Sequence, residues 1–264
     1  MTSLIGVCKW SLDGYGAEAL LQAARLGFGA IHLDSADLGE ALSLEHAALR
    51  DDYLRAAKET GVQITALSPG KLNDYGLSSP AGSPNAIRCR DLIRVSIDAA
   101  AAMGVSLVYL PSFRAGEIFN DGDLGHTAEA LAEACAYAEG RPVAVATENT
   151  LGTDGNLRLL EAAGRPPNLC VLLDTQNVAM WGFDAAAVTD ALWPYLSDQV
   201  HVKDGSGGQM GNALLGEGEA RFGQTAARLR AHDFAGALIS ENDYLGERQA
   251  NAARDIATMT EIFR

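Results

Sequence analysis

The sequence predicts a (β/α)8 barrel, an α/β fold in which eight parallel strands are each followed by a helix. Eight short apolar runs, most of them rich in β-branched residues, alternate with longer Ala- and Leu-rich segments along the 264 residues. Several of these segments end at a glycine just before the next apolar run, as in ARLGFGAI and AAMGVSL, which is typical of a helix end. Because no linker or low-complexity tract divides the chain, we expect a single barrel domain over residues 1–264.

The eight apolar runs are the expected strands. Several are almost continuously hydrophobic, as parallel strands covered on both faces are. The expected strands span residues 4–8, 30–34, 62–68, 105–111, 142–148, 168–174, 199–203 and 236–241.

The segments between these strands have the length and composition of helices. The expected helices span residues 17–27, 45–59, 85–103, 126–139, 184–195 and 221–232, with a shorter one at 154–164 and a terminal one from about 247 to 263. A doubly wound sheet is the competing architecture. It often carries a glycine-rich phosphate loop after its first strand, whereas CKWSLDGYG has no G-x-G-x-x-G pattern.

The composition argues against some classes of binding partner. The formal charge of −14 disfavours nucleic acid, which requires Lys and Arg to displace counterions. The four cysteines are scattered without a C-x-x-C pair, as in reduced cytosolic proteins. The N-terminus lacks the features of a signal peptide, and no window approaches the length of a membrane span. We therefore expect a soluble cytoplasmic protein without nucleic-acid or membrane partners, and homo-oligomer formation stays open.

Four chemically active residues stand at the ends of four consecutive expected strands. They are Glu148, Asp174, His201 and Glu241, and active sites of such barrels lie at these strand ends. Because side chains alternate along a strand, each of these four residues shares a face with earlier residues of its own strand. Most of those earlier residues are small or apolar, and the exception is Gln199, which precedes His201. These residues are Ala144 and Ala146, Cys170 and Leu172, Gln199, and Ala237 and Ile239.

If these faces point inward, three carboxylates and one imidazole meet in a small volume. Close carboxylates repel and raise one another's pKa unless a cation neutralises them. An O,O,N,O ligand set suits one divalent ion, for which we expect Mn²⁺ first, with Mg²⁺, Co²⁺ or Zn²⁺ as alternatives. A single strand-end acid could instead cap a helix, and a single histidine could be a core residue. Four such residues in sequence favour the metal.

The same strand ends carry a resemblance to a known family. ENT from Glu148, LLDTQN around Asp174, HVKDG from His201 followed by LLGEGEA, and the final ISEN around Glu241 resemble the sugar phosphate isomerase/epimerase superfamily of xylose isomerase-like TIM barrels. Members include ketose 3-epimerases, hydroxypyruvate isomerases and inosose isomerases and dehydratases. The resemblance implies that Glu148, Asp174, His201 and Glu241 hold the metal.

The resemblance also implies a reaction. Glu148 and Glu241 would act as an acid/base pair on opposite faces of a carbon next to a carbonyl, through a metal-stabilised enediolate. The expected function is therefore a metal-dependent isomerase or epimerase of a sugar or polyhydroxy ketone. The alternative is a metal-dependent lyase, a dehydratase, acting on a keto-inositol or related cyclic keto sugar.

Five further residues are expected to bind substrate. Asn177 stands where the family often has a histidine, and its amide can bond a substrate hydroxyl. Lys203 shares the alternation of His201, and Asp204 follows it. Trp10 and Trp181 could wall the pocket or merely pack. The glycine-rich segment 205–218 could close over the substrate.

The residues disfavour three other functions without excluding them. Lys203 could form a Schiff base, as in aldolases. A nuclease of the same superfamily requires many histidines, whereas this chain has five. The barrel could also be a catalytically silent partner subunit, although the presence of all four ligand types argues against that interpretation.

Overall fold

The structure is a computed structural model that describes residues 4–263. Its strands form one closed parallel barrel in the order β1 to β8. The strands are β1 (Leu4–Cys8), β2 (Ala30–Asp34), β3 (Gln63–Ser68), β4 (Leu107–Pro111), β5 (Ala144–Glu148), β6 (Leu169–Asp174), β7 (Leu196–Val202) and β8 (Ala237–Ser240).

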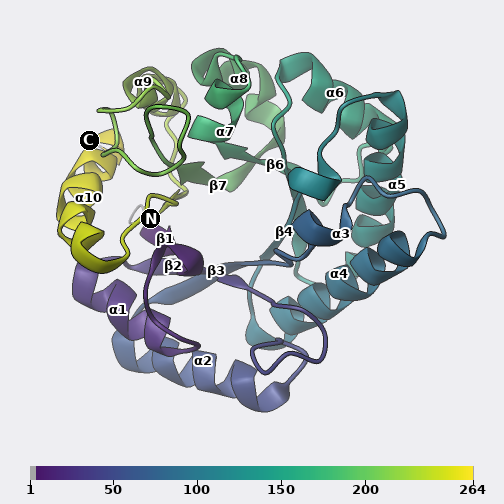
Figure 1. The fold of residues 1–264 in the computed structure, drawn as a ribbon, viewed down its shortest axis with the longest axis horizontal. Helices are drawn as coiled ribbons and strands as arrows, with labels where there is room; N and C mark the ends of the chain where they lie inside the picture. The colour runs from purple at the N-terminus through teal and green to yellow at the C-terminus, as the bar shows by residue number, and fades with distance from the viewer. Residues whose placement is uncertain (1–3, 264) are drawn as a thin grey trace. The chain divides into compact units, whose positions relative to one another are not determined.

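Helices alternate with the strands along the chain (Figure 1). They are α1 (Glu18–Leu26), α2 (Ala47–Thr60), α3 (Leu72–Tyr75), α4 (Pro84–Met103), α5 (Asp121–Ala138), α6 (Thr153–Ala162), α7 (Thr175–Met180), α8 (Ala185–Leu192), α9 (Phe222–Ala231) and α10 (Ala252–Thr260). Short 3₁₀ segments are η1 (Lys9–Ser11), η2 (Arg114–Gly116), η3 (Trp193–Tyr195), η4 (Gly246–Asn251) and η5 (Glu261–Phe263). Within residues 4–263, no helix is long and apolar enough to cross a membrane.

All eight expected strands are confirmed, and the barrel is the correct architecture rather than a doubly wound sheet. The largest difference is in β7, which begins at Leu196 rather than at 199. The polar residues Ser197 and Asp198 interrupt the apolar run, so the first part of this strand was not recognised in the sequence. Lys203 and Glu241 lie one residue beyond the ends of β7 and β8, respectively.

The helices differ most from the expectation at four places. Helix α10 begins at Ala252 rather than at about 247, because the 3₁₀ segment η4 occupies Gly246–Asn251. Helix α5 begins at Asp121 rather than at 126, because the Asn120 side chain accepts hydrogen bonds from the N–H groups of Gly122 and Asp123. Helices α3 and α7 were not expected. Both are short, so neither presents enough apolar residues at helical spacing to be recognised in the sequence.

The chain forms two compact units. The first is Met1–His32, Asp52–Ile64 and Leu173–Arg264, and the second is Leu33–Asp51 and Thr65–Leu172. A single domain over the whole chain stays a prediction. Each unit is described by itself below.

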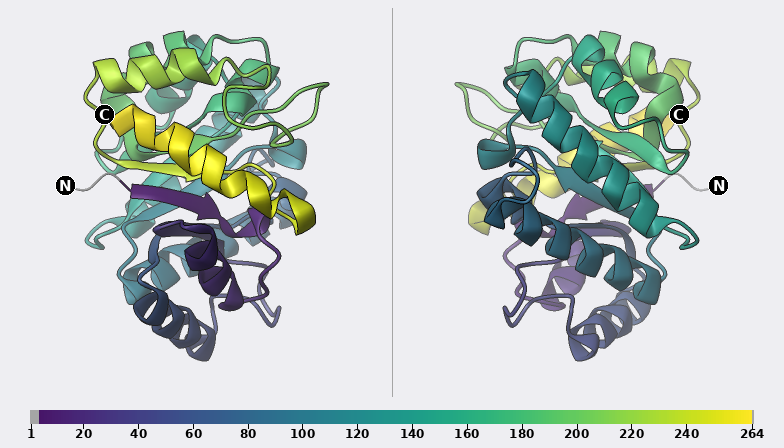
Figure 2. Two further views of the ribbon diagram at one scale, coloured as in Figure 1. Left: turned by 90° about the vertical axis from the view of Figure 1, so that its left-hand side faces the viewer. Right: turned by 90° about the vertical axis from the view of Figure 1, so that its right-hand side faces the viewer.

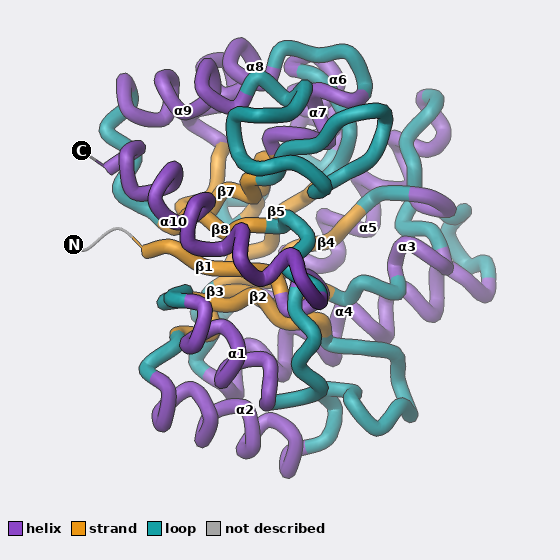
Figure 3. Tube along the Cα trace, turned by 60° about the vertical axis from the view of Figure 1, so that its left-hand side comes forward, coloured by secondary structure: helices purple, strands orange, loops and turns teal. Residues whose placement is uncertain are grey.

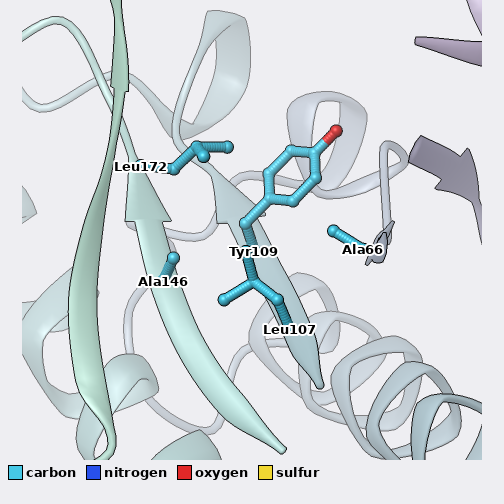
Figure 4. Packing of buried hydrophobic residues seen from close by; sticks show 5 residues of the cluster. All are labelled: Ala66, Leu107, Tyr109, Ala146 and Leu172. Atoms are coloured by element: carbon cyan, nitrogen blue, oxygen red, sulfur yellow. The ribbon is translucent and has the colours of Figure 1, made fainter. Parts of the chain in front are cut away.

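The second unit has a core that confirms the expected strand alternation. Side chains from β3 to β6 pack together there, and Figure 4 shows the buried members: Ala66, Leu107, Tyr109, Ala146 and Leu172. Side chains two residues apart in a strand share one face. Glu148 therefore lies on the face of Ala146, and Asp174 lies on the face of Leu172.

The first unit has its own interior cluster of Cys8, Ala30, Ala237 and Ile239. Gly6 of β1 is required there, because an added Cβ would lie 2.8 Å from the backbone carbonyl oxygen of Ala30. Helix α10 lies beside β1 (Figures 2 and 3).

A long loop, residues 205–220, joins β7 to α9 (Figure 3). Asp204 holds it at its base. One carboxylate oxygen accepts hydrogen bonds from the N–H groups of Gly205 and Ala220, and the other accepts from those of Gly216 and Gly218. Gly218 can only be glycine, since a Cβ would lie 2.2 Å from the Asp204 carboxylate. The carboxylate therefore organises the loop.

We expect Asp204→Asn to destabilise the protein, because the amide presents N–H donors to backbone N–H donors. The expected loss is about 2 kcal/mol in the free energy of unfolding, as for a hydrogen bond to a charged group. Thermal and urea unfolding followed by circular dichroism would measure it. Asp198→Asn, on an exposed position of β7, is the matched control. An Asp204→Asn variant as stable as this control would contradict the anchoring role.

Candidate active site

Three of the four predicted ligand residues meet in the first unit. Asp174 ends β6, His201 lies in β7 and Glu241 follows β8. One ligand atom from each lies within 4.8 Å of those of the other two. Asp174 and His201 are 1% and 0% exposed, and the Glu241 side chain is 17% exposed. The structure thus brings two carboxylates and an imidazole together in a largely buried position.

Lys203 lies between the two carboxylates. Its Nζ is 2.5 Å from Oε2 of Glu241 and 3.3 Å from Oδ2 of Asp174. The Lys203 backbone is held by Thr175, whose hydroxyl donates to the Lys203 carbonyl and accepts from its N–H. The ammonium therefore neutralises part of the charge that two buried carboxylates would otherwise share.

Glu241 is held as a carboxylate. Burial alone would raise its pKa, but the Lys203 ammonium, then His201, and hydrogen bonds from Lys203 and Trp10 lower it to about 2. The indole N–H of Trp10 donates to Oε1 of Glu241 across 2.7 Å. At neutral pH this side chain therefore carries a negative charge in a fixed orientation.

The two carboxylate oxygens of Asp174 have different neighbours. Its Oδ1 accepts hydrogen bonds from the N–H groups of Gln176 and Asn177, which caps α7. Its Oδ2 faces Lys203. The helix-cap interpretation of this strand-end acid is thus confirmed, and its role as a metal ligand stays a prediction.

A second row of polar residues lies behind His201. His32 Nδ1 is 2.9 Å from His201 Nε2, His32 Nε2 is 2.7 Å from Gln199 Oε1, and Cys8 Sγ is 3.6 Å from His201 Nε2. Burial, with His201 as a second cause, lowers the pKa of His32 to about 3. His32 is therefore neutral at neutral pH.

The sequence alone does not predict a role for His32. Its strand, AIHLD, is otherwise apolar apart from the terminal Asp34, and His32 shares the face of Ala30. The feature of the sequence that could have indicated a role is a histidine at a position of the strand that faces the barrel interior.

The fourth predicted ligand residue, Glu148, belongs to the second unit. It ends β5 and is 3% exposed, and its carbonyl accepts a hydrogen bond from the Ser112 N–H. Its neighbour Thr147 is in register with Val171 of β6. Its role as a ligand and as a catalytic acid/base stays a prediction.

The five expected substrate residues lie in different environments. Asn177 is buried in α7, and its Oδ1 has no hydrogen-bond partner among the described residues. Trp10 and Trp181 are 40% and 48% exposed. Trp10 and Lys203 both contact Glu241, whereas the Asp204 carboxylate is occupied by its loop. Substrate binding by all five stays a prediction.

We expect Lys203→Met to lower the free energy of unfolding by about 3 kcal/mol near neutral pH, because two buried carboxylates lose their counter-charge. Lys203 helps to lower the pKa of Glu241 to about 2, so its stabilisation is present above the unfolded glutamate pKa of about 4.3. The stabilisation is lost as the pH falls towards 2. The deficit of the variant should therefore shrink on acidification.

Urea unfolding of chelator-treated protein across this pH range would measure the effect. Lys58→Met, on an exposed position of α2, should change the stability by at most about 0.5 kcal/mol. A Lys203→Met deficit that is equal at every pH would show that Lys203 contributes packing rather than charge.

Known proteins resemble this chain along nearly its whole length. The 2-epi-5-epi-valiolone 7-phosphate 2-epimerase of an Actinoplanes species is 33% identical over 257 residues, which cover 97% of this chain and 93% of that protein. A solved L-ribulose 3-epimerase superposes with a TM-score of 0.80 at 19% identity, covering 99% of this chain and 95% of the other.

A D-allulose 3-epimerase from a Methylomonas species, solved with D-allulose, superposes with a TM-score of 0.76 at 17% identity, covering 98% and 97% of the two chains. At these identities the two solved structures support the fold alone. The 33% identical relative is named as an epimerase, and the chain is accordingly an enzyme. The model of the xylose isomerase-like TIM barrel matches residues 20–262. The resemblance found in the strand-end motifs is therefore confirmed: the chain belongs to the xylose isomerase-like TIM barrel family.

Proposed function

We propose that this enzyme is a divalent-metal-dependent epimerase of a polyhydroxylated ketone. The observation that carries the proposal is the group of Asp174, His201 and Glu241, whose ligand atoms lie within 4.8 Å of one another. The 33% identity to a 2-epimerase over 97% of this chain supports the reaction type.

The donor set fits a divalent cation. Two carboxylates and an imidazole supply hard oxygen ligands and one nitrogen, which Mn²⁺, Mg²⁺, Co²⁺ and Zn²⁺ accept. We assign Glu148 as the fourth ligand. The ENT motif that begins at Glu148 supports this assignment, because its resemblance to the family implies a ligand at this position. A bound cation would supply Lewis-acid polarisation of the substrate carbonyl, which acidifies the adjacent C–H bond.

The two glutamates move the proton. Glu241 is ionised at neutral pH, so its carboxylate can accept a proton from the carbon next to the carbonyl. Glu148 then returns a proton to the opposite face of that carbon, and the configuration is inverted. The Trp10 indole holds Glu241 in place. The Lys203 ammonium adds positive charge where the enediolate becomes negative.

The remaining predicted residues orient the substrate. The buried Oδ1 of Asn177 has no partner among the described residues, and a substrate hydroxyl can donate to it. Trp10 and Trp181 expose part of their rings, which suits packing against the apolar faces of a sugar. Asp204 contributes through the 205–220 loop that its carboxylate holds.

We expect the protein, purified without chelator, to contain about one divalent ion per chain, as one ligand set of this kind would hold. Plasma mass spectrometry would identify the metal. Asp174→Ala should lose it, because one carboxylate ligand is removed. Asp91→Ala, on an exposed position of α4, should retain it. Protein that holds no metal even after addition of Mn²⁺ or Zn²⁺ would refute the proposal.

We expect Glu148→Gln and Glu241→Gln each to lower turnover by about a hundredfold to ten-thousandfold, as the loss of a general acid or base does. The substrates to test are 2-epi-5-epi-valiolone 7-phosphate, D-allulose and L-ribulose. Epimerisation in deuterated water should incorporate one deuterium at the inverted carbon, detected by NMR. Both variants should still bind metal more tightly than Asp174→Ala, because a Gln side chain keeps one oxygen ligand.

The product distinguishes the two reaction classes. Deuterium uptake with an unchanged carbon skeleton supports the epimerase. A dehydrated product would instead identify the lyase. Retention of full turnover in either Gln variant would contradict the two-glutamate mechanism.

A further inference from the structure

We propose that His32 is a positioning residue: it accepts a hydrogen bond from Nε2 of His201 and thereby leaves Nδ1 of His201 to face the carboxylates as the metal-binding atom. The inference rests on the proposed function for its metal. The hydrogen bond itself can be tested without metal.

The contact geometry defines a row of three side chains within the first unit. Gln199 Oε1 lies 2.7 Å from His32 Nε2, and His32 Nδ1 lies 2.9 Å from His201 Nε2. The two imidazole rings are tilted by 47° with centroids 5.1 Å apart, so they meet at their nitrogen edges rather than by stacking. His32 and His201 are both 0% exposed and Gln199 is 4% exposed, which excludes bulk water from competing for these bonds.

The direction of each hydrogen bond follows from the donor inventory. An amide oxygen can only accept, so His32 Nε2 carries a proton. A neutral imidazole has one N–H, and a buried histidine that meets uncharged partners at both nitrogens stays neutral. His32 Nδ1 therefore presents a lone pair to His201. The proton between the two rings must then belong to His201 Nε2.

Because Nε2 of His201 carries this proton, Nδ1 is the nitrogen with a lone pair available to a metal. Nδ1 is the other ring nitrogen and lies 3.9 Å from Oε2 of Glu241. Histidine ligands generally donate their second N–H to an acceptor that sets ring orientation and ligand basicity. Here the acceptor is another histidine, which Gln199 orients in turn.

Cys8 offers a competing interpretation. Its Sγ lies 3.6 Å from His201 Nε2, and Cys8, His32 and His201 have ligand atoms within 4.8 Å of one another. These three residues could hold a soft metal instead. The 2.9 Å separation of His32 Nδ1 and His201 Nε2 is a hydrogen-bond distance, which favours the shared proton. Cys8 therefore serves as the matched control.

The first experiment determines the proton position in the wild-type protein. Long-range ¹H–¹⁵N NMR of chelator-treated, ¹⁵N-labelled protein distinguishes protonated from unprotonated ring nitrogens. We expect His201 Nε2 to be protonated and His32 Nδ1 to be unprotonated. An unprotonated His201 Nε2 would overturn the inference, whether or not the enzyme binds metal.

The second experiment measures Mn²⁺ affinity by calorimetry. His32→Leu should weaken binding about 10–100-fold, as the loss of such a partner does. His32→Asn should recover most of the affinity, because its Oδ1 can accept from His201 Nε2. Cys8→Ala should leave the affinity unchanged.

The outcomes separate this inference from the proposed function. If wild type binds Mn²⁺ and His32→Leu binds it equally well, the positioning role is wrong while the proposed function stands. If Cys8→Ala loses as much affinity as His32→Leu, the soft-metal interpretation replaces it. If wild type binds neither Mn²⁺ nor Zn²⁺ in the same titration, the proposed function and the metal-directing role both fail. Should His32→Leu not fold, the wild-type spectrum and the Asn variant decide.

Discussion

The buried charge of Asp174 and Glu241 is the constraint on which the first unit's site depends. Two carboxylates in so little solvent require positive charge, and the Lys203 ammonium supplies it at 2.5 and 3.3 Å. The neighbouring contacts support the same arrangement. Thr175 holds the Lys203 backbone, and Trp10 holds Glu241. A divalent cation would satisfy the same electrostatic demand, so the site is organised for positive charge before any substrate chemistry begins.

The backbone around this site is organised by carboxylates as well. Asp174 caps α7 directly at the end of β6, and Asp204 holds the 205–220 loop just beyond β7. Consecutive strand ends thus use the same residue type for two purposes. One carboxylate oxygen of Asp174 orders the helix while the other faces the site, whereas both oxygens of Asp204 bind backbone. The residue type alone does not distinguish these roles.

Much of the fold and of the site group could be predicted from the sequence. The strand bounds followed from apolar runs, and the inward faces followed from alternation, as the packing of Ala146, Leu172 and Ile239 confirms. Alternation also brought Asp174, His201 and Glu241 together correctly. The short helix α7 and the early beginning of α5 were not predicted. Each depends on a side-chain cap, Asp174 for α7 and Asn120 for α5. The role of His32 could not be predicted, because its partners, Gln199 and His201, lie far away in the sequence.

The sequence by itself determined the fold class, the family and the three side chains that meet in the first unit, because strand period and chain order are local properties. Only the tertiary structure decided how those side chains are used. It paired Lys203 with Asp174 and Glu241 rather than with Asp204, and it committed Asp204 to the loop. It also placed His32 against His201. These choices depend on distances between residues on different strands, and the spacing within one strand does not contain them.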